Sequence, residues 1–585
     1  QKGVGEIKIE SGDQVVWYYS ALGSSLPTAG EVVIEPSASR PSYDSFWPQF
    51  GAGSALTNVI TPAESADLLW SFDYKTVTSA EGVSDPLVVN GDIYLVSGGI
   101  LMKIDAATGR PTASATVGSA NRYFCRPAYA DGLIVIPTDD GRLAAFTANA
   151  LACVWRTESL GASDGSVSYQ ALSTLTVNGG YAYAGFTQPG AANSTGTAGA
   201  LVCVRMSDGK LMWANKGVTS SSGKPEGYYW AGAAASGSDI VIGDESGAVV
   251  LIEGDTGKVK SSVSLGAPCR STIVSVGDGR TLLAVTSDGV LYKIVREGDA
   301  LSVAGRVSFA RSSTSTPVVS NGTVFVCGAD ADGYGTLSLI DLAGMCVDRT
   351  VVGGLGAAQG SPLVSIQGDG TYAYFTCNGL PGGVYAYRVG DAAAYALYTP
   401  AGPQQNYCTA SVIADEEGNL YYTNDAGVLF ALKGRAGFRV TFDSMGGSFV
   451  PSGMAVKDKP IVQPADPSRD GYSFGGWFVD SACTRTWDFE TPVDGDMTLY
   501  ARWVTNARPG GVGGSGDESN GTSGSFWASS GAPGAAHAPL VRQSSGKVGG
   551  RTDKVAKEAS SPNGESGPGN TRVAEPNGED AAVTA

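Results

Sequence analysis

The chain has 585 residues, which is too long for one ordinary domain, so we expect at least two domains with linkers. Its formal charge of −17, from 39 Lys and Arg against 56 Asp and Glu, argues against nucleic acid as a partner, because phosphate binding needs clustered cations. The longest apolar runs are too short for a membrane-spanning helix. One His and nine Cys without a CxxC pair argue against the usual zinc sites and against Ser-His-Asp catalysis.

Residues 1–20 contain a strand, a Gly-Asp turn and a second strand that ends in Trp17, Tyr18 and Tyr19. Two strands cannot bury a core by themselves. The segment GVGEIKIESGDQVVWYYS resembles the closing strands of a transcobalamin C-terminal-like domain. This resemblance implies that residues 1–20 are the remnant of an upstream β domain. Residues 21–67 are expected to be a linker and a lead-in to the next domain.

An internal repeat occupies residues 68–434. An apolar strand, a Gly-containing turn and a β-branched or aromatic strand recur eight times, with 41 to 58 residues between successive turn glycines. A period of about 40–50 residues with four strands per unit is typical of β-propellers. The turn glycines are Gly91, Gly132, Gly179, Gly237, Gly279, Gly322, Gly370 and Gly418. The chain is therefore predicted to be all-β, with an eight-bladed β-propeller, a small β-grasp module and a disordered tail.

The turns DAATGRP, RMSDGKLMW and EGDTGKVK share an Asp, a Thr or Ser, and a Gly, and one is followed by Trp. This pattern resembles the pyrroloquinoline-quinone (PQQ)-like repeat of quinoprotein-type propellers, over residues 46 to 434. The last hairpin ends at Lys433 without an outer strand, so LLWSFDY (Leu68–Tyr74) is predicted to supply that strand and close the ring. Trp70, Trp155 and Trp213 occupy comparable fourth-strand positions and are predicted to pack between blades.

The resemblance raises quinone-dependent oxidation as a function. Family members with that activity hold calcium through Glu, Asn and Asp, and many carry adjacent cysteines. This chain has no adjacent cysteines and no Glu, Asn and Asp set at matching blade positions. We therefore expect no enzymatic activity, no catalytic residue, and neither PQQ nor calcium as a cofactor. Asp330 and Asp332 have calcium-loop spacing, but the later ligands of such a loop are missing, so a hairpin turn is favoured over a metal site.

Ligand binding is better supported, because the loops between blades open around the central funnel of such a propeller. These loops are rich in aromatic, amide and Arg side chains, which suit stacking on sugars or gripping an extended peptide. The alternative is that the aromatic rings plug the channel or cap blade edges. The candidate ligand-binding residues at the funnel mouth are Arg122, Tyr123, Tyr169, Gln170, Tyr228, Tyr229, Trp230, Arg270, Gln359, Asn406 and Tyr407.

Several cysteines occupy equivalent positions on different blades, which favours packing as buried thiols over a disulfide framework. Export of the chain would permit pairs such as Cys377–Cys408 or Cys153–Cys203, but connectivity does not follow from the sequence.

Residues 437–503 resemble the internalin B-type (Listeria–Bacteroides) repeat, a β-grasp module of bacterial surface proteins. The resemblance rests on MGGS, GYSFGGWF, WDF and MTLYARW. The expected aromatic core is Phe442, Tyr472, Phe474, Trp477, Trp487, Phe489, Tyr500 and Trp503. Residues 504–585 have almost no aromatic side chains and are predicted to be a disordered stalk or an inert tail.

Together these features predict an extracellular, monomeric binding or adhesion protein that is secreted or displayed on the bacterial cell surface. We expect a protein or glycan ligand at the propeller face, and attachment to a membrane or cell wall only through an anchor outside this chain. The alternative is an envelope scaffold like the outer-membrane assembly lipoproteins. The internalin-type module favours the first function, because its known settings are Gram-positive surfaces.

Overall fold

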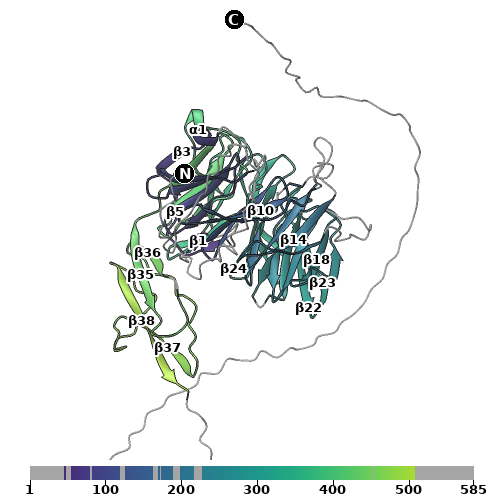
Figure 1. Cartoon of the computed structure of the whole chain (residues 1–585). Coiled ribbons are helices and arrows are strands. Elements are labelled where there is room, and N and C mark those ends of the chain that lie inside the picture. The colour runs from purple at the N-terminus through teal and green to yellow at the C-terminus, as the bar shows by residue number, and fades with distance from the viewer. Residues whose placement is uncertain are drawn as a thin grey trace, which may run out of the picture. The chain divides into compact units, whose positions relative to one another are not determined.

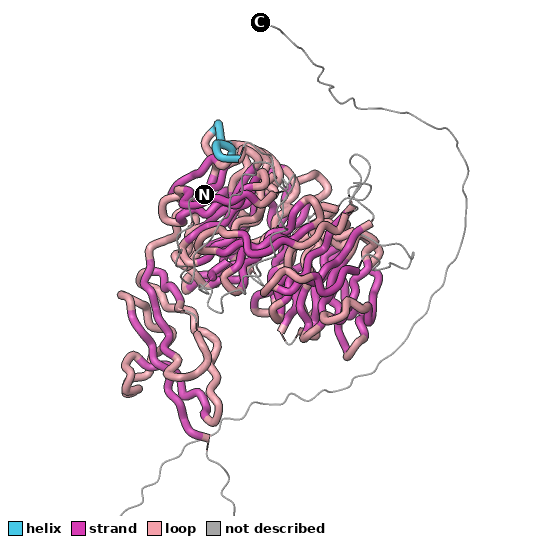
Figure 2. Tube along the Cα trace, in the orientation of Figure 1, coloured by secondary structure: helices cyan, strands magenta, loops and turns pink. Residues whose placement is uncertain are grey.

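The computed structural model describes residues 45–47, 55–78, 82–118, 126–161, 169–170, 173–188, 198–215, 227–277, 279–450 and 452–506. The predictions for residues 1–20 and for nearly all of the tail concern residues outside these ranges. Strands and loops make up almost all of the described chain (Figures 1 and 2), together with the short helix α1 (Lys75–Thr78) and a 3-10 turn over Gly402–Gln404. Within this part, no helix is both long and apolar enough to cross a membrane.

Eight propeller sheets of antiparallel strands occur in the described residues. In the first seven, four consecutive strands pair in chain order from the innermost to the outermost. The first sheet comprises β4 (Leu87–Val89), β5 (Asp92–Ser97), β6 (Ile100–Asp105) and β7 (Pro111–Thr116), and the second comprises β8 (Ala128–Ala130), β9 (Leu133–Thr138), β10 (Arg142–Thr147) and β11 (Cys153–Arg156). The third sheet comprises β12 (Thr176–Asn178), β13 (Tyr181–Thr187), β14 (Gly199–Arg205) and β15 (Leu211–Asn215). The fourth comprises β16 (Ala234–Ser236), β17 (Asp239–Gly243), β18 (Ala248–Glu253) and β19 (Val259–Ser264).

The fifth sheet comprises β20 (Val274–Val276), β21 (Thr281–Thr286), β22 (Val290–Glu297) and β23 (Ala300–Ser308). The sixth comprises β24 (Val318–Ser320), β25 (Thr323–Ala329), β26 (Tyr334–Asp341) and β27 (Cys346–Leu355). The seventh comprises β28 (Leu363–Gln367), β29 (Gly370–Thr376), β30 (Val384–Arg388) and β31 (Tyr395–Tyr398). The all-β propeller prediction is confirmed by this arrangement and by a similar solved structure reported below.

The eighth sheet joins the two ends of the propeller. Its inner strands β32 (Ile413–Ala414), β33 (Leu420–Asn424) and β34 (Val428–Leu432) come from the end of the repeat, and its outer strand β3 (Leu68–Asp73) comes from the beginning. β3 pairs antiparallel with β34, with Asp73 opposite Val428. The predicted closing strand is therefore confirmed, and this pairing covers an edge of β34 that would otherwise be exposed.

The lead-in before β3 does more than connect two domains. β1 (Ser45–Trp47) pairs antiparallel with β4, and β2 (Leu56–Thr57) pairs parallel with β28. Both partners are innermost strands, whose free edges face the propeller axis. Because these edges carry unpaired backbone groups, the two short strands satisfy them from the axial side. Part of the segment predicted as a linker thus lies inside the central channel.

Tryptophan side chains connect neighbouring sheets. The indole N–H groups of Trp70, Trp155 and Trp213 donate to backbone carbonyls of the following sheet at 2.9, 2.9 and 2.8 Å. Each ring lies against a turn glycine of that sheet, and a Cβ added at Gly109 would come within 2.4 Å of the Trp70 ring. The Asp-x-x-Thr-Gly turn thus needs Gly both for its positive φ and for the ring above it. The prediction of inter-blade packing is confirmed.

The eight described cysteines are free thiols, so neither Cys377–Cys408 nor Cys153–Cys203 is a disulfide. Cys153 is exposed, together with Cys346. The buried thiols, which pack between strands as predicted, are Cys203, Cys269, Cys327, Cys377 and Cys408.

The C-terminal module is a four-stranded sheet in the order β36 (Gly453–Val456), β35 (Gly437–Asp443), β38 (Met497–Thr505) and β37 (Tyr472–Phe478). β35 and β38 are parallel, and both outer pairs are antiparallel. Its core contains Phe442, Phe474, Trp477, Trp487, Phe489 and Trp503. Tyr472 and Tyr500 are half-buried outside that core, which corrects their predicted place, and β38 extends two residues beyond the predicted end at residue 503.

Candidate functional site

A set of equivalent positions encircles the propeller axis. Each sheet contributes the residue that lies two positions before its innermost strand. These residues therefore lie at the same height along the propeller axis. We call them the axial ring: Asp85, Arg126, Thr174, Gly232, Thr272, Thr316, Ser361 and Ser411.

A buried ion pair starts the axial ring. The Arg126 Nε donates to the Asp85 Oδ2 at 3.0 Å, and their side chains are only 10% and 6% exposed. The Arg126 Nη1 donates to the Thr174 Oγ1 at 3.1 Å and to the Trp230 carbonyl at 3.3 Å. One guanidinium therefore joins the first four sheets.

Hydroxyl groups continue the axial ring. The Thr272 Oγ1 donates to the Thr174 Oγ1 at 3.1 Å, and the backbone N–H of Thr272 donates to the Thr316 Oγ1 at 3.0 Å. The N–H of Thr316 donates to the Ser361 Oγ at 2.9 Å, and the N–H of Ser361 donates to the Ser411 Oγ at 2.9 Å. The backbone of Ser411 then donates to the Asp85 carboxyl group, which closes the circuit of sheets.

Gly232 is the ring member without a side chain. A Cβ there would lie 2.3 Å from the Thr272 Oγ1 and 2.8 Å from the Thr174 Cβ. Parallel bridges join Gly232 to both of these threonines, so the backbones approach too closely for any other residue.

Burial sets the electrostatics of the ion pair. Burial raises the pKa of Asp85, and the Arg126 charge and hydrogen bond oppose that rise. Burial likewise lowers the pKa of Arg126, while Asp85 opposes the change. Each ion is therefore tolerated in the interior because of the other.

Beside the axial ring, the loops before the fourth and fifth sheets form an aromatic cluster. The Arg270 guanidinium lies 5.0 Å from the centroid of the Tyr229 ring, and the Tyr229 and Trp230 rings are 5.0 Å apart at 36°. Arg270 also donates to both carboxylate oxygens of Glu245, at 2.9 and 2.8 Å. Three predicted ligand-binding residues are thus brought together. We call Tyr229, Trp230, Glu245 and Arg270 the aromatic cluster.

The cluster is held rigidly and partly exposed. Trp230 has a φ of 58°, and its carbonyl accepts the hydrogen bond from Arg126. Its indole nitrogen is buried without a hydrogen-bond partner among the described residues. Tyr229 and Trp230 are half-buried, and the Arg270 side chain is 22% exposed. Because Glu245 neutralises Arg270, the cluster offers flat rings and hydrogen-bond donors rather than a net positive charge.

Two predicted ligand-binding residues belong to the core instead. Tyr169 is 4% exposed and packs between the second and third sheets, and Tyr228 is 1% exposed and packs with the fourth. The prediction assigned them to the funnel mouth because they precede innermost strands. The structure corrects it, since the chain turns them inward to fill gaps between sheets.

The remaining predicted residues lie in other loops. Gln170 is half-buried and bridges Thr187 through its backbone. The Gln359 Oε1 accepts a hydrogen bond from Asn378 at 3.2 Å. Asn406 caps the backbone N–H of Tyr407, whose side chain is exposed. Arg122 and Tyr123 lie outside the described residues.

The acidic pair in the sixth sheet has a structural use. The Asp330 Oδ1 accepts the backbone N–H groups of Asp332 and Tyr334 at 3.0 and 2.8 Å, which stabilises the hairpin turn. Across the part of the chain that the structure describes, no three His, Cys, Asp or Glu side chains gather in a way that could hold a metal ion.

The axial ring does not fit a calcium-bound quinone. Calcium needs several oxygen ligands, usually with more than one carboxylate. Asp85 is the one carboxylate among the ring positions, and Arg126 occupies its Oδ2.

Sequence reasoning missed the axial ring and Glu245. Aligning the eight repeats on their innermost strands would have shown a small or polar residue at the ring position in most of them. Glu245 gave no such signal, because it lies in a turn and meets Arg270 only after the fifth sheet packs on the fourth.

Comparisons with known proteins agree with two of the three resemblances. Residues 438–502 match the model of the Listeria–Bacteroides repeat domain. Residues 59–227 match a model described as outer membrane protein assembly factor BamB. The predicted PQQ-like and internalin B-type repeats are therefore confirmed, whereas the transcobalamin-like remnant stays a prediction.

One similar solved structure shows the same fold, and a second is less similar. The quinohemoprotein alcohol dehydrogenase ADHIIG from Pseudomonas putida HK5 is 14% identical, with 67% of this chain and 80% of that chain covered and a TM-score of 0.51. BamB from Moraxella catarrhalis is 15% identical, with 63% and 97% covered and a TM-score of 0.43. At these identities the likeness concerns the fold alone.

Two curated relatives come from Evansella cellulosilytica, and their names describe them as membrane proteins. They are 46% and 44% identical over 70 residues, which is 12% of this chain. The match spans only 8% and 10% of the length of these relatives.

Proposed function

We propose that this chain is a non-enzymatic binding protein of the bacterial cell surface, whose propeller binds a protein or glycan ligand at the aromatic cluster. The single observation that carries the proposal is the locked group of Tyr229, Trp230 and Arg270 beside the axial ring. A rigid aromatic surface loses little entropy when a ligand stacks on it. Trp, Tyr and Arg are also the residues that contribute most at binding interfaces.

The extracellular, Gram-positive location is part of the proposal. The match to the Listeria–Bacteroides repeat supports it, as do the membrane-protein names of the Evansella relatives. The absence of a catalytic activity and of PQQ or calcium is also proposed. The pairing of the only ring carboxylate with Arg126 supports that part.

Defined glycan and peptide arrays would test the binding function. The chain should bind a reproducible subset of spots, and Tyr229→Ala together with Trp230→Ala should abolish that binding while the thermal unfolding midpoint stays within a few degrees. Phe449→Ala is the matched control, because it removes an aromatic ring that is 87% exposed in the other domain. Unchanged binding by the double variant would reject the aromatic cluster.

An activity assay tests the non-enzymatic part separately. The chain is incubated with PQQ, Ca²⁺, a redox dye and a panel of alcohols and sugars. We expect no reduction of the dye above the rate without protein. Saturable turnover would overturn the proposal.

A second candidate is a scaffold for assembling envelope proteins, which the BamB match over residues 59–227 favours. The scaffold differs from the adhesion protein in its ligand, which would be a folded protein or an extended strand. Binding to the peptide array but to no glycan would favour it over adhesion to a glycan surface.

A further inference from the structure

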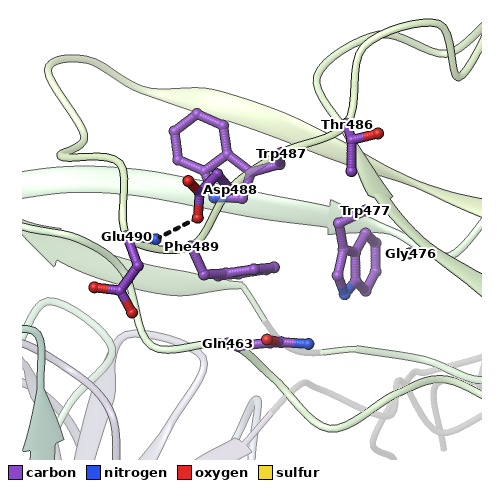
Figure 3. A pocket seen from close by; sticks show the side chains of 8 residues that line it. All are labelled: Gln463, Gly476, Trp477, Thr486, Trp487, Asp488, Phe489 and Glu490. Carbon is purple, nitrogen blue, oxygen red and sulfur yellow. Dashed lines mark hydrogen bonds between the residues drawn. The ribbon is translucent and has the colours of Figure 1, made fainter. Parts of the chain in front are cut away.

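The C-terminal module contains a cavity of about 350 Å³ beside β37. Aromatic and polar side chains line it together: Trp477, Trp487 and Phe489 with Gln463, Asp488 and Glu490 (Figure 3). This volume lies at the lower end of the range for small-molecule sites. A mixed lining of this kind differs from a packing defect, which would be apolar throughout.

A β-bulge gives the cavity its shape. The pairing of β37 with β38 shifts between Phe474 and Trp477, so that β37 carries one extra residue there. Gly476 within this bulge has a φ of 99°, and a Cβ at this residue would meet nothing within 4 Å. The bulge therefore redirects Trp477 and leaves open space beside it.

Trp477 is fixed in the wall of the cavity. Its ring is 2% exposed and packs edge-to-face against Phe442 at 4.9 Å and against Phe474 at 5.5 Å. Its indole nitrogen is nevertheless buried, and no described residue supplies a hydrogen-bond acceptor for it. Figure 3 shows the nitrogen end of the ring directed toward the side of the cavity where Gln463 lies. A buried N–H without an acceptor is unfavourable, so an acceptor from a ligand would remove this defect.

Trp487 repeats this feature. Its backbone N–H donates to the Trp477 carbonyl at 2.8 Å, which holds the two residues side by side. Its indole nitrogen is also buried without a partner among the described residues. The Asp488 Oδ1 accepts the backbone N–H of Glu490 at 3.0 Å, and both acidic side chains are exposed at the rim. The cavity lining thus combines the unused donor of Trp477 with carboxylate acceptors and aromatic rings.

We propose that this cavity binds one uncharged pyranose ring. The indole N–H of Trp477 donates to a ligand oxygen, and the rim carboxylates accept hydrogen bonds from sugar hydroxyls. The apolar face of the sugar packs against an aromatic ring. This site is independent of the aromatic cluster on the propeller.

The lining distinguishes this ligand from two others. An aromatic cage for a quaternary ammonium group presents ring faces, whereas Trp477 presents its N–H edge, which is the positive end of the ring. An anionic ligand would meet the carboxylates of Asp488 and Glu490. A neutral ligand with both donors and acceptors satisfies the whole set.

Calorimetric titration of the full chain tests the proposal. The probes are methyl glucoside, methyl galactoside, methyl mannoside and N-acetylglucosamine, with glucuronate and choline as charged alternatives. We expect saturable heat with at least one uncharged sugar and weaker binding of both charged probes. Trp477→Phe keeps the packed ring but removes the N–H, and should weaken sugar binding about fivefold, the value of one hydrogen bond.

Trp503→Phe is the matched control, because it removes a module indole N–H that already donates to the Ser444 carbonyl at 2.8 Å. It should leave sugar affinity unchanged. Trp477→Phe also removes buried indole volume beside Phe442 and Phe474, so its thermal midpoint is measured and both chains are titrated well below it. Absence of heat with every uncharged sugar, choline binding as tight as the best sugar, or equal affinities of the native chain and Trp477→Phe would each overturn the proposal. If the Tyr229→Ala, Trp230→Ala variant loses the heat of sugar binding and Trp477→Phe keeps it, the sugar binds to the propeller and not to this cavity.

Discussion

The Asp85–Arg126 ion pair offers the sharpest test of the axial ring. Its two side chains are 6% and 10% exposed and joined at 3.0 Å, so solvent screens each ion very little. Replacing one partner leaves the other charge buried and unpaired, which typically costs about 3–5 kcal/mol. We therefore expect Asp85→Asn and Arg126→Gln each to lower the free energy of unfolding by about that amount. The double variant should lose less than the sum, because it leaves no unpaired ion.

The pH dependence separates the two single variants. In Arg126→Gln, burial raises the pKa of Asp85 in the folded protein without an opposing cation. The folded state then binds a proton more tightly than the unfolded state, whose Asp pKa is about 3.9. Stability is therefore highest below about pH 4 and falls as the pH rises through the folded pKa. Asp85→Asn has no carboxyl group there, so its loss should be nearly independent of pH.

Urea-induced unfolding of the native chain and the three variants, at about pH 4.5 and about pH 8, measures these differences from midpoints and slopes. The reasoning would be refuted if both single variants lost less than about 1 kcal/mol, or if the double variant showed simple additivity. If the free energy of unfolding that Arg126→Gln loses does not grow with pH, the Asp85 carboxyl group is not desolvated in the folded protein.

Two further predictions concern packing and reactivity. Gly232→Ala should destabilise the propeller by about 1–3 kcal/mol, because the new Cβ overlaps its neighbours. Gly402→Ala is the control and should be nearly neutral, because nothing lies within 4 Å of its new Cβ. Equal urea midpoints of the two variants would contradict the close approach at Gly232. A thiol reagent at neutral pH should label Cys153 and Cys346 first, because burial raises the pKa of the thiols in the core and keeps them protonated and covered. Rapid labelling of the buried cysteines in the native chain would show that the sheets open.

Much of the fold follows from local patterns. The regular spacing of turn glycines and the short apolar strands between them predict four-stranded units, since a strand and its turn depend on neighbouring residues. The sequence also predicted that Leu68–Asp73 closes the propeller, because the last repeat has no outer strand of its own. Trp70 could be placed between sheets because its position repeats at Trp155 and Trp213.

The candidate sites depended on contacts that no local pattern encodes. Tyr228 and Tyr229 are adjacent in sequence, yet one fills the core and the other stacks under Arg270, because neighbouring sheets admit only one of the two rings. The sequence determined which side chains reach the loops, through strand length and turn position. The tertiary structure decided which of them are covered, because the space between sheets and the partners of buried charges, such as Arg126 beside Asp85, exist only once the ring has closed.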